Sequence, residues 1–93
     1  MNNDIPNYII TLTNAIIDKR HIIIFISKYE GDKIKSVDYL INFMNIAMNY
    51  KLIFINVKKN NINFIYRYYT TIFQINVEYN QMKQIYKISC EIK

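Results

Sequence analysis

Hydrophobic positions in the first third of the chain change from a helical spacing to an unbroken apolar run. Asp4 and Pro6 are typical of a helix start, and an apolar residue then recurs every three or four positions, which predicts a helix ending near Lys19. This apolar row comprises Ile5, Ile9, Leu12 and Ile16. Residues 22–26 are all Ile or Phe, which is typical of a strand buried on both faces. Residues 28–32 are expected to form a loop, in which Gly31 could take a positive φ.

A second helix is predicted between Lys33 and Asn49. One apolar row contains Ile34, Val37, Ile41, Met44 and Met48, and a second contains Tyr39, Phe43, Ile46 and Tyr50. A helix with two apolar rows has most of its surface covered by something. It either packs on a sheet and on the first helix, or it turns its second row toward a partner protein.

After Lys51 the hydrophobic period becomes two, which predicts strands joined by hairpin turns. The first turn is expected at Asn60-Asn61, where Asn tolerates the left-handed conformation, with Val57 opposite Phe64 and Ile55 opposite Tyr66. A bend is expected at 69–71, because residues 62–79 are too many for one ordinary strand.

The second hairpin turn is expected at Asn80-Gln81, with Ile75 opposite Tyr86 and Glu78 opposite Lys83. The fold class is therefore α+β, with two helices packed on a mainly antiparallel sheet of about five strands. The expected order of elements is α-β-α-β-β-β-β.

Length, composition and charge narrow the class of protein. The 93 residues predict a single domain over 1–93, and a hydrophobic fraction of 52% supports a core. A net charge of +5 favours nucleic acid, anionic lipid or an acidic protein as partner, although most of the cations are Lys. We expect no membrane span, since the longest apolar run is 22–26, and the single Cys90 fits a reducing, cytoplasmic location.

We expect no catalytic or metal site and no cofactor or small-molecule substrate. His21 and Cys90 are the sole residues of their types, so neither a nucleophile–base pair nor a four-ligand zinc site is indicated. With Gly31 as its one glycine, the chain also lacks a phosphate-binding loop. Structural roles are the better interpretation of His21 and Cys90, and we predict that the protein is not an enzyme.

A basic and polar sheet face is the most distinctive candidate site. If Phe64 and Ile75 face the core, the opposite side of the two hairpins carries Lys, Asn and Gln side chains suited to RNA phosphates and base edges. The RNA-binding candidates are Lys58, Lys59, Arg67, Tyr69, Lys83 and Lys87. The competing interpretation is an ordinary solvated face in a chain whose composition is biased toward Lys, Asn and Tyr.

A protein interface is the alternative candidate. The helix row Tyr39, Phe43, Ile46 and Tyr50 exceeds what two helices and one sheet need, and surplus apolar surface is typical of an interface. An exposed sheet edge could also accept an added strand. This hypothesis describes a protein-interaction module, for instance a small viral or phage-encoded inhibitor or a homodimeric binding protein.

Residues 55–67, with their continuation over 72–75, resemble a strand–turn–strand segment of small eukaryotic-type large-subunit ribosomal proteins. The chain departs from that family by a helix and a strand before Lys33 and by fewer basic residues. The resemblance implies a small basic, non-enzymatic accessory subunit of an RNA–protein assembly. Such a subunit would bind RNA without sequence specificity and would contact neighbouring proteins. It assigns no functional residue.

Overall fold

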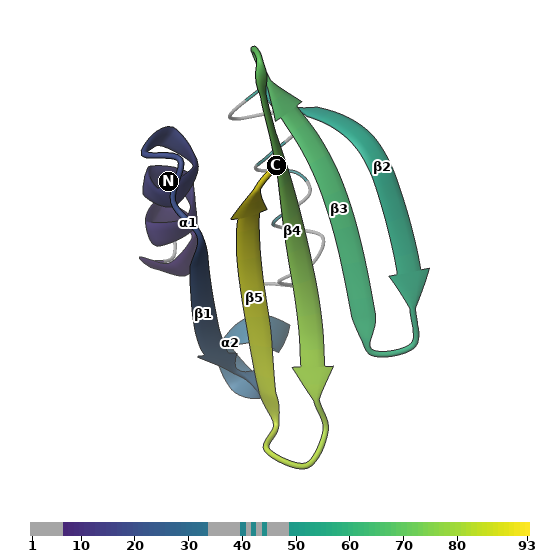
Figure 1. Cartoon of the computed structure of the whole chain (residues 1–93). Coiled ribbons are helices and arrows are strands. Elements are labelled where there is room, and N and C mark those ends of the chain that lie inside the picture. The colour runs from purple at the N-terminus through teal and green to yellow at the C-terminus, as the bar shows by residue number, and fades with distance from the viewer. Residues whose placement is uncertain (1–6, 34–39, 41, 43, 45–48) are drawn as a thin grey trace.

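Five strands form one antiparallel sheet in the order β1-β5-β4-β3-β2 (Figure 1). The computed structural model describes residues 7–33, 40, 42, 44 and 49–93. The strands are β1 (Ile22–Ser27), β2 (Lys51–Lys58), β3 (Asn61–Tyr68), β4 (Thr71–Asn80) and β5 (Ile85–Ile92), and the helices are α1 (Asn7–Ile17) and α2 (Lys28–Lys33). The predicted mixture of helices with an antiparallel sheet of about five strands is confirmed.

Helix α1 lies within the first predicted helix and stops where the backbone turns left-handed. Lys19 has a φ of 57°, and its N–H donates to the Ile16 carbonyl at 3.1 Å. The next N–H, of Arg20, donates to the Ala15 carbonyl at 2.8 Å. This pair of bonds satisfies carbonyl groups that the helix end leaves without a partner. The predicted start at Asp4 and Pro6 lies outside the described residues.

The prediction of a loop at 28–32 is wrong, because this segment forms the short helix α2. Ser27 precedes the helix, and its Oγ accepts a hydrogen bond from the Glu30 N–H at 3.1 Å. A serine followed three residues later by glutamate is a known helix-start pattern, and it was present in the sequence. Gly31 lies inside α2 and does not adopt a positive φ.

Most of the second predicted helix, Lys33–Asn49, lies outside the described residues. Within it, Leu40 and Asn42 are helical, and Leu40 and Met44 are buried in the core. The second helix in the described order of elements is therefore α2, which is a different segment from the predicted one.

The first hairpin forms as predicted, with a different turn. β2 and β3 are joined through Lys59-Asn60, so Val57 lies opposite Ile62 and Ile55 opposite Phe64. Neither Asn60 nor Asn61 has a positive φ, which removes the reason for placing the turn there. The register also shifts between Leu52 and Phe54, where β2 contains a bulge.

The bend predicted at 69–71 is the turn between β3 and β4, in which Tyr68 lies opposite Thr71. The second predicted turn is displaced, because residues 81–84 form a four-residue connection between β4 and β5. Ile75 therefore lies opposite Cys90, and Glu78 lies opposite Lys87 instead of Lys83. Asn80 Oδ1 accepts a hydrogen bond from the Lys83 N–H at 3.0 Å, which stabilises the longer connection.

The core lies on one face of the sheet, where α1 and the described residues Leu40 and Met44 cover the strands. Its centre is a group of aromatic rings in contact with Tyr50, which the helix row had suggested as an interface residue. The ring centroid of Tyr50 lies 4.9 Å from that of Tyr68 and 5.1 Å from that of Phe73. The largest fully buried side chains are Tyr66, Phe64, Phe73, Ile9, Leu12, Leu40, Met44, Ile75, Ile88 and Cys90.

Candidate functional site

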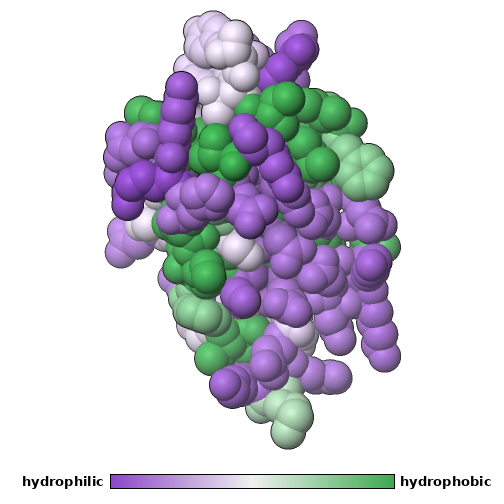
Figure 2. All heavy atoms as spheres, viewed as in Figure 1, coloured by the Kyte–Doolittle hydropathy of each residue, from purple (hydrophilic) through white to green (hydrophobic). Residues whose placement is uncertain are grey.

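The sheet has one face that is opposite the core, which we call the open face. Figure 2 views the molecule from this side. Side chains alternate between the two faces of a strand, so the positions between the buried ones form this face. The open face comprises Ile23 and Phe25 of β1, Ile85, Lys87, Ser89 and Glu91 of β5, Ile72, Gln74, Asn76 and Glu78 of β4, Asn61, Asn63, Ile65 and Arg67 of β3, and Phe54, Asn56 and Lys58 of β2. Hydrophilic side chains gather over its middle, with hydrophobic ones toward the sheet edges and one end (Figure 2).

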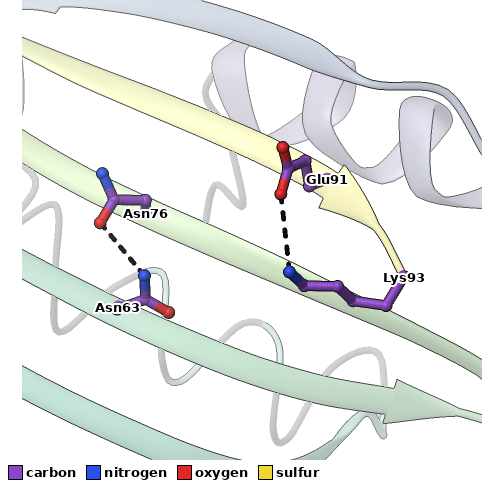
Figure 3. A network of polar contacts seen from close by, with 4 residues as sticks. All are labelled: Asn63, Asn76, Glu91 and Lys93. Atoms are coloured by element: carbon purple, nitrogen blue, oxygen red, sulfur yellow. Dashed lines mark hydrogen bonds and ion pairs between the residues drawn. The ribbon is translucent and has the colours of Figure 1, made fainter.

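A row of amide and hydroxyl side chains crosses the middle of the open face. Asn56 lies opposite Asn63, which lies opposite Asn76, and Asn76 lies opposite Ser89. Asn63 Nδ2 donates to Asn76 Oδ1 at 3.5 Å, and both side chains lie on the side of the sheet away from the helices (Figure 3). Such a row offers donors and acceptors but no charge.

A shallow hollow of about 860 Å³ covers part of this row. Polar side chains from β3, β4 and β5 line it, together with His21, which directly precedes β1, and Lys58 at the end of β2. Glu91 also lines it and forms an ion pair with Lys93 at 3.7 Å (Figure 3). Among the described residues that line the hollow there is no Phe, Tyr or Trp, so the His21 imidazole is the ring there on which a nucleic-acid base would stack.

The cations predicted to bind RNA do not form one cluster. Lys58 and Lys59 lie at the turn between β2 and β3, and Lys83 lies in the connection between β4 and β5. Both connections lie at the same end of the sheet (Figure 1). Arg67 is near the other end of β3, about 20 Å away at ~3.3 Å per residue. Lys87 is on the open face, directly opposite Glu78.

The predicted aromatic candidates occupy very different surroundings. Tyr69 is 82% exposed in the turn after β3, where its ring contacts that of Tyr68 at a centroid distance of 4.5 Å. Tyr50 is 3% exposed, so it belongs to the core and offers no surface for a partner. The other proposed interface residues, Tyr39, Phe43 and Ile46, lie outside the described residues.

Edge strand β2 has exposed side chains on both of its faces, a feature that the sequence pattern did not reveal. All eight of its residues are exposed. Val57 is 65% exposed although it points to the same side as the core, and Phe54 is 52% exposed on the open face. The other edge strand differs, because α1 and α2 both contact β1 and Ile26 is buried.

The surroundings of Cys90 are unfavourable for nucleophilic chemistry. The thiol is buried, and its burial raises the pKa to about 12, which keeps the sulfur protonated at neutral pH. Among the described residues, no group of three or more His, Cys, Asp or Glu side chains could hold a metal ion. No helix in the described part of the chain is long and apolar enough to cross a bilayer.

No protein-family model matches the chain, and no curated protein or solved structure matches it significantly. The resemblance of residues 55–67 to ribosomal proteins therefore stays a prediction. Support for a function therefore comes from the geometry of edge strand β2 and of the open face.

Proposed function

We propose that this chain is a non-enzymatic protein-interaction module that binds an extended segment of a partner protein as an added strand along β2. The observation that carries the proposal is that every residue of β2 is exposed, so that the strand presents apolar side chains on both faces at the edge of the sheet. A long, apolar and unpaired edge is a template for another strand, and globular proteins ordinarily cover or charge such edges.

The exposed apolar side chains supply affinity in addition to backbone hydrogen bonds. Ile55 and Val57 lie on the core side of β2, and Phe54 lies on the open side beside Ile65. An added strand would cover residues of both groups at once. Burying apolar surface yields about 25 cal/mol per Å², so these side chains strengthen binding to a strand whose own side chains are apolar.

The proposal is tested by comparing the proteins that co-purify from the native source with three forms of the chain as bait. A nuclease-treated extract is passed over the natural chain and over Val57→Pro, and Glu78→Gln serves as the matched surface control. We expect a partner that is retained by the natural chain and by Glu78→Gln and lost with Val57→Pro. Its binding should slow hydrogen exchange at the Ile55 and Val57 amides. Recovery of the same proteins with all three baits would overturn strand addition.

RNA binding through the open face is the second candidate function. It is supported by the net charge of +5 and by the presence of Lys58, Lys87 and Arg67 on a face that also offers Asn and Gln amides. In this form the chain would be an accessory subunit of a ribosome-like RNA–protein assembly. Two carboxylates, Glu78 and Glu91, share the same face and weaken its positive potential.

Salt dependence tests this second candidate directly. Binding of a single-stranded RNA oligonucleotide should fall steeply between ~50 and ~200 mM salt, because each neutralised phosphate releases counterions. The double substitution Lys58→Gln and Lys87→Gln should weaken binding and reduce the slope of affinity against salt. Retention that is insensitive to salt, or unchanged in the double variant, would contradict RNA binding by this face.

A further inference from the structure

Rows of backbone hydrogen bonds identify which residues of β2 direct their polar groups outward. The Tyr79 N–H donates to the Asn60 carbonyl at 2.9 Å, so even-numbered residues of β3 bond to β4. Odd-numbered residues of β3 therefore bond to β2, where their partners are Phe54, Asn56 and Lys58. The N–H and C=O groups of the residues in between, Ile55 and Val57, point to the free edge.

The charged residues of β2 and β3, the two strands at this edge, all have one sign. From Lys51 to Val77 the sequence contains four cations and no Asp or Glu, a stretch that comprises β2, β3 and most of β4. Lys51 and Lys58 occupy the two ends of β2, about 23 Å apart at ~3.3 Å per residue. Lys59 follows in the turn, and Arg67 lies directly opposite Lys51. Cations thus stand at both ends of an apolar middle.

From this arrangement we propose, as an extension of the proposed function on which it rests, that the partner segment is an extended peptide with an apolar centre and acidic ends. Its carboxylates lie near Lys58 and Lys59 at one end and near Lys51 and Arg67 at the other. Its backbone bonds to the outward groups of Ile55 and Val57. Opposite charges placed across an interface speed association and fix the register of the two strands.

Charge repulsion also makes a second copy of the chain an unfavourable partner for the β2 edge. Antiparallel pairing of two β2 strands would bring two such stretches together, with eight cations and no carboxylate between them. Like charges in direct opposition on neighbouring strands are unfavourable. With a partner that has acidic ends, these repulsions between cations are replaced by attractions between carboxylates and cations.

The experiment measures the binding of two labelled nine-residue peptides by fluorescence anisotropy. The acidic peptide is Glu-Glu-Val-Thr-Val-Thr-Val-Glu-Glu, and the basic peptide replaces each Glu by Lys. An exposed ion pair changes affinity by about 1.4- to 5-fold, so several pairs should make the acidic peptide bind about tenfold more tightly at low salt. The difference should largely disappear in ~1 M salt, where the screening length is about 3 Å.

Two variants of the chain separate backbone pairing from charge recognition. Val57→Pro removes an outward N–H and should abolish binding of the acidic peptide. The double substitution Lys58→Gln and Lys59→Gln should retain binding and lose most of the preference for acidic ends. Urea unfolding of both variants checks that the fold is intact.

Each outcome affects a different part of the inference. Equal affinity for the two peptides would overturn acidic recognition and leave strand addition standing. Lack of binding by both peptides, or full binding by a folded Val57→Pro, would overturn strand addition itself. A dimer of the natural chain that Val57→Pro abolishes would assign the edge to a second copy. Displacement of the acidic peptide by single-stranded RNA would assign the cations to nucleic acid, and either result would overturn the proposed partner.

Discussion

At the scale of single residues, the positions where the backbone is left-handed are occupied by residues other than glycine. Lys19, Asn49, Tyr69 and Gln84 have φ angles of 54–57° in the described part of the chain. A left-handed conformation costs a residue with a Cβ atom about 1–2 kcal/mol. Sequence patterns placed turns near several of these positions. The bend predicted at 69–71 includes Tyr69, but no pattern indicated a left-handed conformation at Tyr69 or Gln84, because neither residue type favours it.

Gln84→Gly is therefore expected to stabilise the fold. Gln84 is exposed and its carbonyl accepts a hydrogen bond from the Lys28 N–H at 2.9 Å, a bond that glycine retains. The free energy of unfolding, measured by urea titration, should rise by about 1 kcal/mol. Gln81→Gly, in the same connection at a residue without a positive φ, is the matched control and should be neutral or slightly destabilising. Equal effects of the two substitutions would contradict this explanation.

Three buried side chains that lose a proton only at high pH, Cys90, Tyr50 and Tyr66, should make the free energy of unfolding fall at alkaline pH. Burial raises the pKa of Cys90 from 9.0 to about 12 and that of Tyr50 and Tyr66 from 10.0 to about 12. The folded chain retains these protons where the unfolded chain loses them. The contribution of the three protonated groups to the free energy of unfolding is therefore fully present below pH 9. It is lost as the pH rises toward 12. Each proton changes the free energy of unfolding by about 1.4 kcal/mol per pH unit in this window.

Urea unfolding at a series of pH values between 8 and 11 measures this loss. The transition midpoint should be constant below pH 9 and fall progressively above it. In Cys90→Ala, the fall should begin nearer pH 10, where the tyrosines of the unfolded chain start to ionise. A midpoint that is independent of pH up to 11 would show that these groups are accessible to water.

At the scale of elements, the faces of the strands were predictable and their registers were not. The residue that the prediction placed opposite Phe64 differs from the observed one by two positions, and the residue opposite Ile75 differs by four. Since side chains alternate with a period of two, even shifts leave every residue on its expected face. Arg67 and Lys87 therefore do lie opposite the core. Local turn chemistry set the registers, and Asn60-Asn61 was a misleading signal.

Two prolines in β2 should have opposite effects on stability. The N–H of Asn56 faces β3, so Asn56→Pro removes a ladder hydrogen bond and should lower the free energy of unfolding by about 1–3 kcal/mol. The N–H of Val57 faces the free edge, where proline is tolerated, and Val57→Pro should change it by less than about 1 kcal/mol. Urea titration distinguishes the two. The reverse order of stabilities would mean that the outward groups of β2 have been assigned to the wrong residues.

At the scale of the whole molecule, the order of the strands decides which surface is free, and this order was not predictable. β1 pairs with β5, although 57 residues separate the end of one from the start of the other. That pairing leaves β2 at the opposite edge, while its run of apolar residues is typical of a covered strand. Periodicity reports which face of a strand is apolar. It does not report whether another strand lies beside it.

Charge should keep the chain monomeric in dilute salt. We expect sedimentation at low ionic strength to give a monomer, because self-pairing at β2 would bring cations together. In ~1 M salt this repulsion is screened, and the exposed apolar edge should promote self-association. Val57→Lys, which places a charge at the centre of the edge, should remain monomeric under both conditions. Self-association of Val57→Lys to the same extent as the natural chain would locate the contact elsewhere.

The bulge between Leu52 and Phe54 limits how much of a docked segment can pair regularly with β2. Beyond Phe54 the alternation of faces is out of step, so a regular strand that continued past this point would present its apolar side chains to the wrong side. Regular pairing is confined to the five residues from Phe54 to Lys58, so the end of the segment near Lys51 and Arg67 lies outside the regular ladder. A recognition motif for this edge is consequently short enough to recur in unrelated proteins, and its complexes should form and dissociate rapidly.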